Sequence, residues 1–304
     1  MPQITAPSST GDRDSTAMDG GFRDRAFIGL QHLLPQHALS RLVGAAARSR
    51  IGFLRLALIH GFLRRYPVDL SEAARPDPRA YLSFNDFFTR RLRSDARPAD
   101  PDPRAVLSPV DGIVSQAGTI DGDALVQAKG IGYSAAALLG GDEAAAAAFA
   151  GGAFATLYLA PHHYHRIHMP IAGTLRHARF VPGDLYSVNA ATAAAVPGLF
   201  TRNERIACLF DTIAGPMAVV LVGALFVGSM SLAWTGIVRP RTRRAVTELP
   251  ARDPFIALDR GAELGGFNMG STVVVLFGPS GPTLAPGLIP GSEVRVGARL
   301  ATLP

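Results

Sequence analysis

Three short stretches of the sequence combine the residue types that catalysis uses. "SPVDGIV" contains Asp111, and "GGFNMGSTVVVLFG" places the Gly270–Ser271 bond directly before a run of β-branched residues. The third stretch, "YLAPHHYHRIHMP", holds half of the chain's eight histidines: His162, His163, His165 and His168. A serine, a histidine and an aspartate that lie far apart in a sequence can meet in a fold as nucleophile, base and orienting acid. The combination therefore predicts nucleophilic and acid–base chemistry.

Two of these stretches also have a purely structural interpretation. Asp111-Gly112 between apolar runs is a strong hairpin signal, which makes Asp111 a turn residue. Gly270 before Ser271 suits a turn that opens a strand.

The histidines raise the alternative of a metal site. His165 and His168 are three residues apart, and on a helix they would share one face. However, Pro161 and Pro170 bracket the segment, and the chain has no HExxH pattern near it and a single cysteine, Cys208. We therefore expect no metal, and we expect proton transfer instead, because histidine titrates near neutrality.

Ser271 lacks the G-x-S-x-G surroundings of a hydrolase nucleophile elbow. Gly270 leaves the preceding carbonyl open, so the Ser271 hydroxyl is placed to attack its own peptide bond. That attack would move the acyl group from nitrogen to oxygen, and β-elimination of the resulting ester would give dehydroalanine, which hydrolyses to a pyruvoyl group. A serine hydrolase is an alternative, and it predicts that a serine-reactive phosphonate labels the intact chain.

The composition is basic and rather apolar. The chain has 304 residues, of which 48% are hydrophobic and 18% charged, with a net charge of +6 and a pI of about 10.1. Such a balance suits nucleic acid or an anionic membrane surface. One cysteine excludes an intrachain disulfide, and Lys129 is the only lysine.

The N-terminal third reads as a tail followed by helices. Residues 1–24 are small and polar and lack the apolar core of a signal peptide, which predicts a disordered tail. From Phe22 to Tyr66 apolar residues recur at helical steps and arginines punctuate them. This pattern is typical of basic amphipathic helices in a membrane interface, and a helical hairpin packed on the protein core is the alternative.

The remainder reads as short strands separated by glycine and aspartate. We predict an α+β fold, with a helical, membrane-contacting region and connector at 25–98 and a mostly antiparallel β body at 99–304. "AAALLGGDEAAAAAFAGG" is the one clear helix of this body. Residues 215–234 carry no charge and are long enough to span a bilayer. Their valines, Gly223 and Gly228 predict two strands instead, and contact of this segment with the bilayer stays open.

Taken together, the motifs resemble those of the phosphatidylserine decarboxylases of bacterial type. They occur in the family's order from about Phe22 to near the end of the chain. The matching segments are "FNDFFTRRLRSDARP", "SPVDGIVSQ", "QAKGIGYS", "YLAPHHYHRIHMP", "FVPGDLYSVN", "LFTRNERIACLFDT", "GPMAVVLVGALFVGS" and "MGSTVVVLF". The family usually has leucine where Met269 stands, a conservative change that keeps the Gly-Ser bond.

The resemblance implies self-cleavage at Gly270–Ser271. It would give a β chain, 1–270, and an α chain, 271–304, whose Ser271 becomes the covalent pyruvoyl cofactor. Asp111, His168 and Ser271 match the family's cleavage triad, and His165 matches the histidine assigned to decarboxylation. Lys129 is a candidate for the lipid phosphate only because it lies in a matching motif.

The resemblance also implies the substrate and the location. Phosphatidylserine would form a Schiff base with the pyruvoyl ketone and leave as phosphatidylethanolamine, without metal, pyridoxal phosphate or nicotinamide. The body would resemble the barrel-sandwich hybrid of lipoyl carriers. We expect a peripheral protein on the cytoplasmic face of the cell membrane, bound to an anionic surface, with no nucleic-acid partner, and a homodimer is compatible with this.

Two other functions stay open at this point. One is a pyruvoyl-dependent decarboxylase of another serine-headgroup lipid, and assays with different headgroups separate it from the first. The other is a non-catalytic, carrier-like binding module, for which an uncleaved full-length chain would argue.

Overall fold

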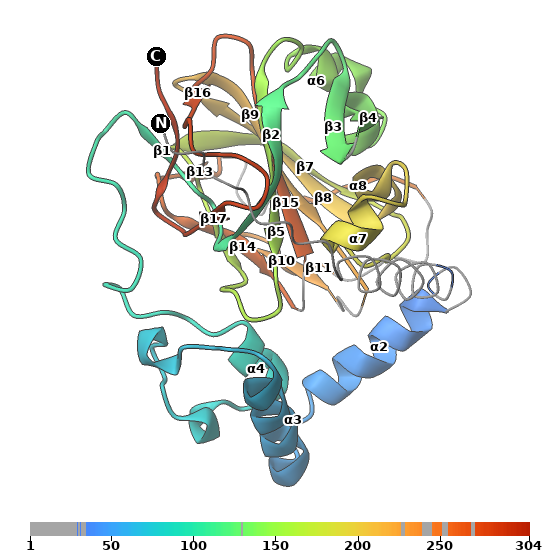
Figure 1. Ribbon diagram of the computed structural model, residues 1–304, viewed down its shortest axis with the longest axis vertical. Coiled ribbons are helices and arrows are strands. Elements are labelled where there is room, and N and C mark those ends of the chain that lie inside the picture. The colour runs from blue at the N-terminus through green and yellow to red at the C-terminus, as the bar shows by residue number, and fades with distance from the viewer. Residues whose placement is uncertain are drawn as a thin grey trace, which may run out of the picture. The chain divides into compact units, whose positions relative to one another are not determined.

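Helices precede the first strand of the chain, and strands dominate after it (Figure 1). The computed structural model describes residues 29, 31, 35–128, 130–225, 229–238, 245–250, 255–268 and 271–304. Nearly all of them belong to the second of two compact units, Pro35–Pro304. The predicted tail 1–24, most of 25–34, Lys129, Met269 and Gly270 lie outside the described residues.

The helices fall into an N-terminal group and a group of short helices within the β body. The N-terminal group comprises α2 (Gln36–Ala47), α3 (Gly52–Arg65), the 3-10 turns η1 (Leu70–Glu72) and η2 (Pro78–Ala80), and α4 (Phe84–Phe88). The second group comprises α5 (Ala135–Leu138), α6 (Glu143–Ala147), α7 (Ala190–Ala193) and α8 (Leu199–Arg202).

Helices α3 and α4 share a small aromatic core. The Ser83 hydroxyl accepts a hydrogen bond from the Asp86 amide and so caps the start of α4. Phe62 of α3 packs against Phe84, Phe87 and Phe88 of α4, with ring centroids 5.4–5.9 Å apart. Within α3 only Ile59 is fully buried, so the helix packs through one face and leaves the other exposed.

The strands form four antiparallel sheets. Their bounds are β1 (Ala105–Leu107), β2 (Gly112–Thr119), β3 (Ala124–Ala128), β4 (Ile131–Ser134), β5 (Ala153–Leu159), β6 (Arg166–His168), β7 (Gly173–Val181), β8 (Arg205–Thr212), β9 (Gly215–Val222), β10 (Met230–Leu232), β11 (Gly236–Val238), β12 (Thr247–Glu248), β13 (Ala257–Leu258), β14 (Glu263–Phe267), β15 (Ser271–Phe277), β16 (Thr283–Leu284), β17 (Glu293–Val294) and β18 (Arg299–Thr302).

A nine-stranded sheet forms the centre of the β body, in the order β12-β7-β8-β9-β15-β5-β2-β17, with β13 beside β7. A four-stranded sheet has the order β11-β10-β14-β6, a three-stranded sheet the order β1-β18-β16, and β3 pairs with β4. The α+β prediction with mostly antiparallel sheets is therefore confirmed. Likeness to the barrel-sandwich hybrid and the division at 98/99 stay predictions.

Strand β15 occupies the middle of the large sheet. It pairs with β5 on one side and with β9 on the other. All of its seven residues are buried, which explains its continuous apolar run, since a strand covered on both faces needs no polar alternation. The strand interpretation of 215–234 is confirmed for β9 and β10. No helix among the described residues is both long and apolar enough to cross a membrane.

Two local predictions are wrong. Asp111-Gly112 does not join a hairpin: β1 pairs with β18, whereas β2 pairs with β5 and β17, so this dipeptide links two different sheets. The predicted single helix at 135–152 is two short helices, α5 and α6, because Gly140 and Gly141 adopt φ of 84° and 87° between them.

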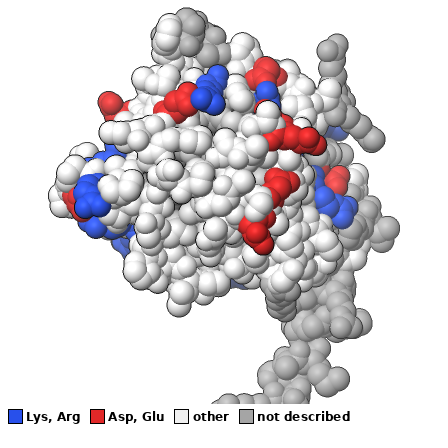
Figure 2. Space-filling model, turned by 90° about the horizontal axis from the view of Figure 1, so that it is seen from above, with Lys and Arg blue, Asp and Glu red and all other residues white. Residues whose placement is uncertain are grey.

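Charge is distributed unevenly over the described chain. Residues 35–68 contain six arginines and no acidic residue. The face shown in Figure 2 carries scattered charges of both signs around a broad uncharged area. The segment 35–68 therefore carries six positive charges, as many as the net charge of the whole chain.

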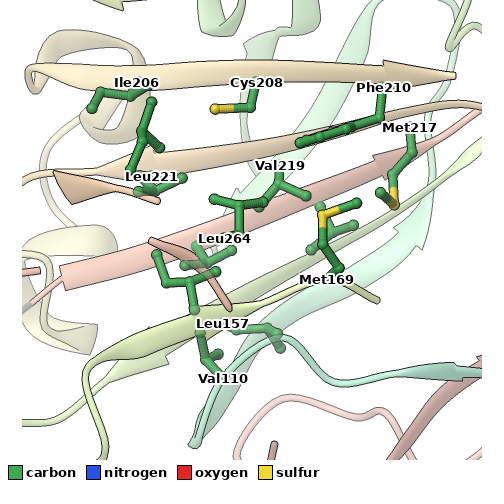
Figure 3. Packing of buried hydrophobic residues seen from close by; sticks show 14 of the residues in the cluster. Val110, Leu157, Met169, Ile206, Cys208, Phe210, Met217, Val219, Leu221 and Leu264 are labelled. Carbon is green, nitrogen blue, oxygen red and sulfur yellow. The ribbon is translucent and has the colours of Figure 1, made fainter. Parts of the chain in front are cut away.

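One hydrophobic cluster joins the large sheet to the four-stranded sheet. Side chains of the central strands, such as Ile206 of β8 and Leu221 of β9, point into it from one side, and Leu264 of β14 reaches it from the other (Figure 3). Because the side chains of this cluster are almost completely buried, their removal from water contributes most to the free energy of folding. The chain passes between the two sheets at the segments described next.

Candidate functional site

Two connections between the large and the four-stranded sheet run side by side. One leads from β5 to β6 through residues 160–165, and the ends of the other, Phe267 of β14 and Ser271 of β15, lie beside the ends of the first. Ser271 pairs with Leu159 in the large sheet, and the Phe267 amide donates to the His165 carbonyl at 3.0 Å in the small one. The antiparallel register therefore places the start of the histidine-rich segment beside Ser271, the first residue of β15.

Ser271 begins β15 with its side chain buried. It is 1% exposed, and its hydroxyl has no hydrogen-bond partner among the described residues. The neighbouring Thr272 hydroxyl is likewise buried without a partner. An unpaired buried hydroxyl is unfavourable by about 1–3 kcal/mol, so its presence at this point calls for a functional explanation.

His165 lies fully buried on the first connection. Its ring stacks on Phe88 of α4, with centroids 4.1 Å apart. Nε2 lies 3.2 Å from the Pro161 carbonyl, to which it donates, and Nδ1 has no partner among the described residues. Burial lowers the pKa of His165 to about 3, so the ring is neutral near pH 7 and its free Nδ1 carries a lone pair.

His168 ends β6 and is held by two other groups. Its Nδ1 donates to the Gly261 carbonyl at 2.8 Å, which leaves Nε2 as the basic nitrogen. The Tyr164 hydroxyl donates to this Nε2 at 3.2 Å. Burial raises the pKa of Tyr164 to about 12, so the hydroxyl keeps its proton.

Asp111 is bound to Arg97 rather than to a histidine. Arg97 donates to its carboxylate from Nε and Nη2, at 3.0 and 2.6 Å, and the Val296 amide donates at 2.9 Å. Arg97 also donates to Glu72 at 2.8 Å. Burial disfavours the charge of Arg97, but the hydrogen bonds to both carboxylates outweigh it and raise the pKa of the guanidinium.

Asp111 and His168 of the predicted triad are held by other groups, and the Ser271 hydroxyl has no partner among the described residues. Among the described residues no hydrogen bond joins Asp111, His168 and Ser271. The His168 amide does donate to the Pro109 carbonyl at 2.8 Å, which fixes β6 beside the segment that carries Asp111.

Two clefts of about 270 Å³ each lie next to this segment. Asp111 lines one of them, together with His162 and His163, and His168 lines the other. Leu92, Arg97 and Tyr164 line both. Ser271 is in neither lining, so in this conformation its hydroxyl is separate from these two clefts.

Several residues of this region were not predicted as site residues. Arg97 lies within the motif "RRLRSDARP", and Tyr164 lies between the histidines, but neither motif states which partner each would take. A third is Glu204, in "TRNERIAC", a buried carboxyl group two strands away from Ser271. Within the described part of the chain no cluster of three or more metal-ligating side chains occurs.

Comparison with known proteins places the chain among enzymes of one kind. The family model "Phosphatidylserine decarboxylase" matches residues 84–302, and a second model, "PSD", matches residues 26–67. A phosphatidylserine decarboxylase proenzyme of Azotobacter vinelandii is 53% identical over 90% of this chain and 97% of the relative. Proenzymes of the same name from Bordetella bronchiseptica and Pseudomonas paraeruginosa are 55% and 54% identical, over 85% and 92% of this chain and 88% and 98% of those relatives.

Proposed function

The chain belongs to the phosphatidylserine decarboxylase family, and we propose that it converts phosphatidylserine to phosphatidylethanolamine by means of a pyruvoyl group formed from Ser271. The observation that carries the proposal is the buried, unpaired Ser271 hydroxyl beside the histidine-bearing connection. The relatives' name, proenzyme, fits a chain that is processed before it acts.

Self-cleavage begins when the Ser271 hydroxyl attacks the carbonyl of Gly270. A base removes the hydroxyl proton, the peptide nitrogen takes up a proton, and the acyl group moves to oxygen. Elimination then separates the chain 1–270 from the chain 271–304, and water replaces the nitrogen of residue 271, which leaves as ammonia. We assign the base to His168, whose Nε2 keeps its lone pair because Nδ1 donates to Gly261.

For this role the ring of His168 has to exchange its Tyr164 partner for the Ser271 hydroxyl. A hydrogen bond of 3.2 Å between neutral groups is weak enough for such an exchange, since its net contribution is about 1 kcal/mol. The Pro109 carbonyl accepts a hydrogen bond from the His168 amide, and Arg97 binds Asp111 two residues further along the same segment. In this assignment Asp111 stabilises the cationic form of His168 during the attack.

The residues at the junction fit a pyruvoyl group. Besides the Ser271 hydroxyl, which the elimination removes, two buried polar atoms have no partner among the described residues: Oγ1 of Thr272 at the start of β15 and Nδ1 of His165 on the first connection. A pyruvoyl group at residue 271 would supply a ketone able to accept the electrons that a departing carboxyl group leaves behind. His165 then holds or returns a proton through Nδ1, and its low pKa keeps this nitrogen unprotonated beforehand.

The two chains stay together after cleavage in this proposal. Chain 271–304 supplies β15, the strand between β5 and β9, and also β16, β17 and β18. Its residues Val273, Val275 and Phe277 belong to the main hydrophobic cluster. Burial of that size holds the small chain in place without a covalent bond.

We propose further that α2 and α3 seat the enzyme on the cytoplasmic face of the cell membrane as a peripheral protein. Exposed apolar side chains of this region, Leu42, Ile51 and Phe53, alternate with exposed arginines such as Arg48 and Arg50. Apolar burial and attraction to anionic lipids act together in such helices.

The test compares the parent protein with Ser271→Ala. Both are purified and run on a denaturing gel, and release of CO₂ is followed with phosphatidylserine and with a second serine-headgroup lipid in mixed micelles. We expect two chains and CO₂ from phosphatidylserine for the parent, and one inactive chain for the variant. Activity in uncleaved Ser271→Ala would overturn the assignment of Ser271, and a preference for the second lipid would overturn the substrate.

A further inference from the structure

Glu204, Gly223 and Ser271 lie in one row across three neighbouring strands. Strand β9 lies between β8 and β15, and Arg205 pairs with Val222, which pairs with Thr272. One step further in the same register, the Gly223 amide donates to the Glu204 carbonyl at 2.9 Å. The same step on the other side of β9 sets Gly223 opposite Ser271. Glu204 and Ser271 are therefore two strand spacings apart, about 10 Å between backbones.

The side chains of Glu204 and Ser271 face the same side of the sheet. Residues in register point to one side, and side chains alternate along each strand. Two positions further along their strands, Ile206, Leu221 and Val273 all belong to the main hydrophobic cluster. Figure 3 shows the first two of these pointing into that cluster. Glu204 and Ser271 therefore sit at the same edge of the same buried layer.

Gly223 opens the path between them. A Cβ at position 223 would lie 3.2 Å from Cγ of Glu204 and 3.5 Å from Cδ2 of Leu185, so the glutamate side chain leans over the glycine of the neighbouring strand β9. A side chain at this position would compete with Glu204 and Leu185 for that space. Gly223 does not have a positive φ angle that would require glycine. The lack of a side chain there instead leaves room for the side chain of Glu204.

The carboxyl group of Glu204 is buried without compensation. The residue is 1% exposed, and its Oε1 atom has no hydrogen-bond partner among the described residues. Burial raises its pKa to about 8, so that it carries a proton near neutral pH. Arg205, the next residue, faces the opposite side and donates to the Leu138 carbonyl. A buried carboxyl group without a hydrogen-bond partner is unfavourable for folding and is typical of a functional site.

We propose that Glu204 is the acid of the elimination step that separates the two chains. This rests on the proposed self-cleavage at Ser271. In this step His168 takes the proton from Cα of residue 271, a double bond forms between Cα and Cβ, and the bond between Cβ and Oγ breaks. Oγ leaves as part of the new carboxyl group of Gly270, which receives the proton of Glu204. Solvent later returns a proton to Glu204.

The physical reason is the burial of the leaving oxygen. Without a donor, the Gly270 carboxylate would form as an uncompensated charge at the edge of a hydrophobic layer. A preplaced acid spreads the developing charge over two carboxyl groups, and the His168 cation formed in the same step balances it, an effect of roughly 10²–10³-fold in rate for a single donor. The acyl shift before it creates no such anion at the end of the step, so it does not depend on Glu204.

The experiment is to follow maturation of Glu204→Gln with and without neutral hydroxylamine. Hydroxylamine cleaves an ester but not a peptide bond, so it reports the product of the acyl shift. We expect Glu204→Gln to yield the pyruvoyl chain at least 100-fold more slowly (roughly the lower value for one donor), and hydroxylamine to split it into two chains, the smaller with a free serine terminus. Normal maturation, or a chain that resists hydroxylamine, would overturn the proposal.

Three further variants test this interpretation. Gly223→Ala should also accumulate the ester, because its Cβ displaces the glutamate side chain, whereas Gly118→Ala in β2, whose nearest atom would be 3.7 Å away, should mature normally. Normal maturation of Gly223→Ala would contradict the path between the residues. Ser271→Ala should resist hydroxylamine, and splitting there would refute the self-cleavage site itself rather than the role of Glu204.

Discussion

The guanidinium of Arg97 holds the carboxylate of Asp111 by two nitrogens, at 3.0 and 2.6 Å. Both side chains are largely buried, and Glu72 accepts a hydrogen bond of 2.8 Å from the same Nη2 that donates to Asp111. Asp111 was expected beside His168, yet in the uncleaved chain it belongs to an ionic network that joins the N-terminal helical region to the segment before β2. This network has measurable consequences.

Replacing Arg97 by Gln should lower the free energy of unfolding by about 3–5 kcal/mol, because it leaves Asp111 without its buried partner. The measurement is urea unfolding in a Ser271→Ala background, in which both proteins remain one chain. Arg93→Gln is the matched control, since Arg93 and Asp95 form an exposed pair. The control should change stability by about 1 kcal/mol or less. Equal effects of the two substitutions would contradict a special role of Arg97.

The two histidines should separate into two steps. His168→Ala and Asp111→Asn should remain largely uncleaved, because each removes the base or its stabilising charge. His165→Ala should cleave and carry pyruvoyl but release CO₂ roughly 10²–10⁴-fold more slowly. A gel scores cleavage, and CO₂ release from the purified protein scores catalysis.

The exposed histidine of α3 is the control for this series, and His60→Ala should cleave and decarboxylate normally. Circular dichroism shows whether each variant is folded. If His165 and His168 only hold the proline-bounded segment, both variants should lose folded protein together. A folded His168→Ala that matures at the parental rate would refute its assignment as base.

Acid should destabilise the fold through His165. Its pKa is lowered from 6.5 to about 3 in the folded chain by burial, so the unfolded chain binds the proton more readily. The stabilising contribution is fully present above pH 6.5 and is lost as the pH falls toward 3. Relative to His165→Gln, the Ser271→Ala parent should lose up to about 1.4 kcal/mol per pH unit in this window. A pH-independent difference between the two would contradict the buried, neutral ring.

Membrane binding should depend on Phe53 of α3, which is 80% exposed. Phe53→Ser should weaken flotation with anionic liposomes, and salt should weaken binding of the parent only in part, because apolar burial remains. Ile213→Ser, at a position 91% exposed in the turn between β8 and β9, should bind like the parent. Equal loss in both variants would argue against α3 as the contact.

The sequence correctly predicted those strands, and singled out those candidate site residues, whose signal lies within one short segment. Valine-rich runs predicted β9 and β15, and the residue types alone singled out Asp111, the histidines and Ser271. It failed where the partner lies elsewhere in the chain. The turn chemistry of Asp111-Gly112 is local, whereas the pairing of β1 with β18 is decided by contacts across almost the whole β body.

In the site, too, the sequence does not reveal contacts between residues that lie far apart in the chain. Glu204 follows Asn203 and precedes an arginine, which in a sequence reads as a charged strand start on the surface. Only the register of β8 and β9 and the absence of a side chain at Gly223 reveal that this side chain is buried and leans over strand β9. Likewise, the bond from Tyr164 to His168 depends on the bend of a short connection and not on its composition.

The most direct test of the account is the intact mass of the two chains after denaturation of the purified protein. We predict a chain that ends at Gly270 and a chain 271–304 that resists N-terminal sequencing and is lighter by one ammonia than the same peptide with an N-terminal serine. The two should elute together before denaturation and apart after it. A single chain of 304 residues, or a small chain with a free serine terminus, would contradict self-cleavage to a pyruvoyl group at Ser271.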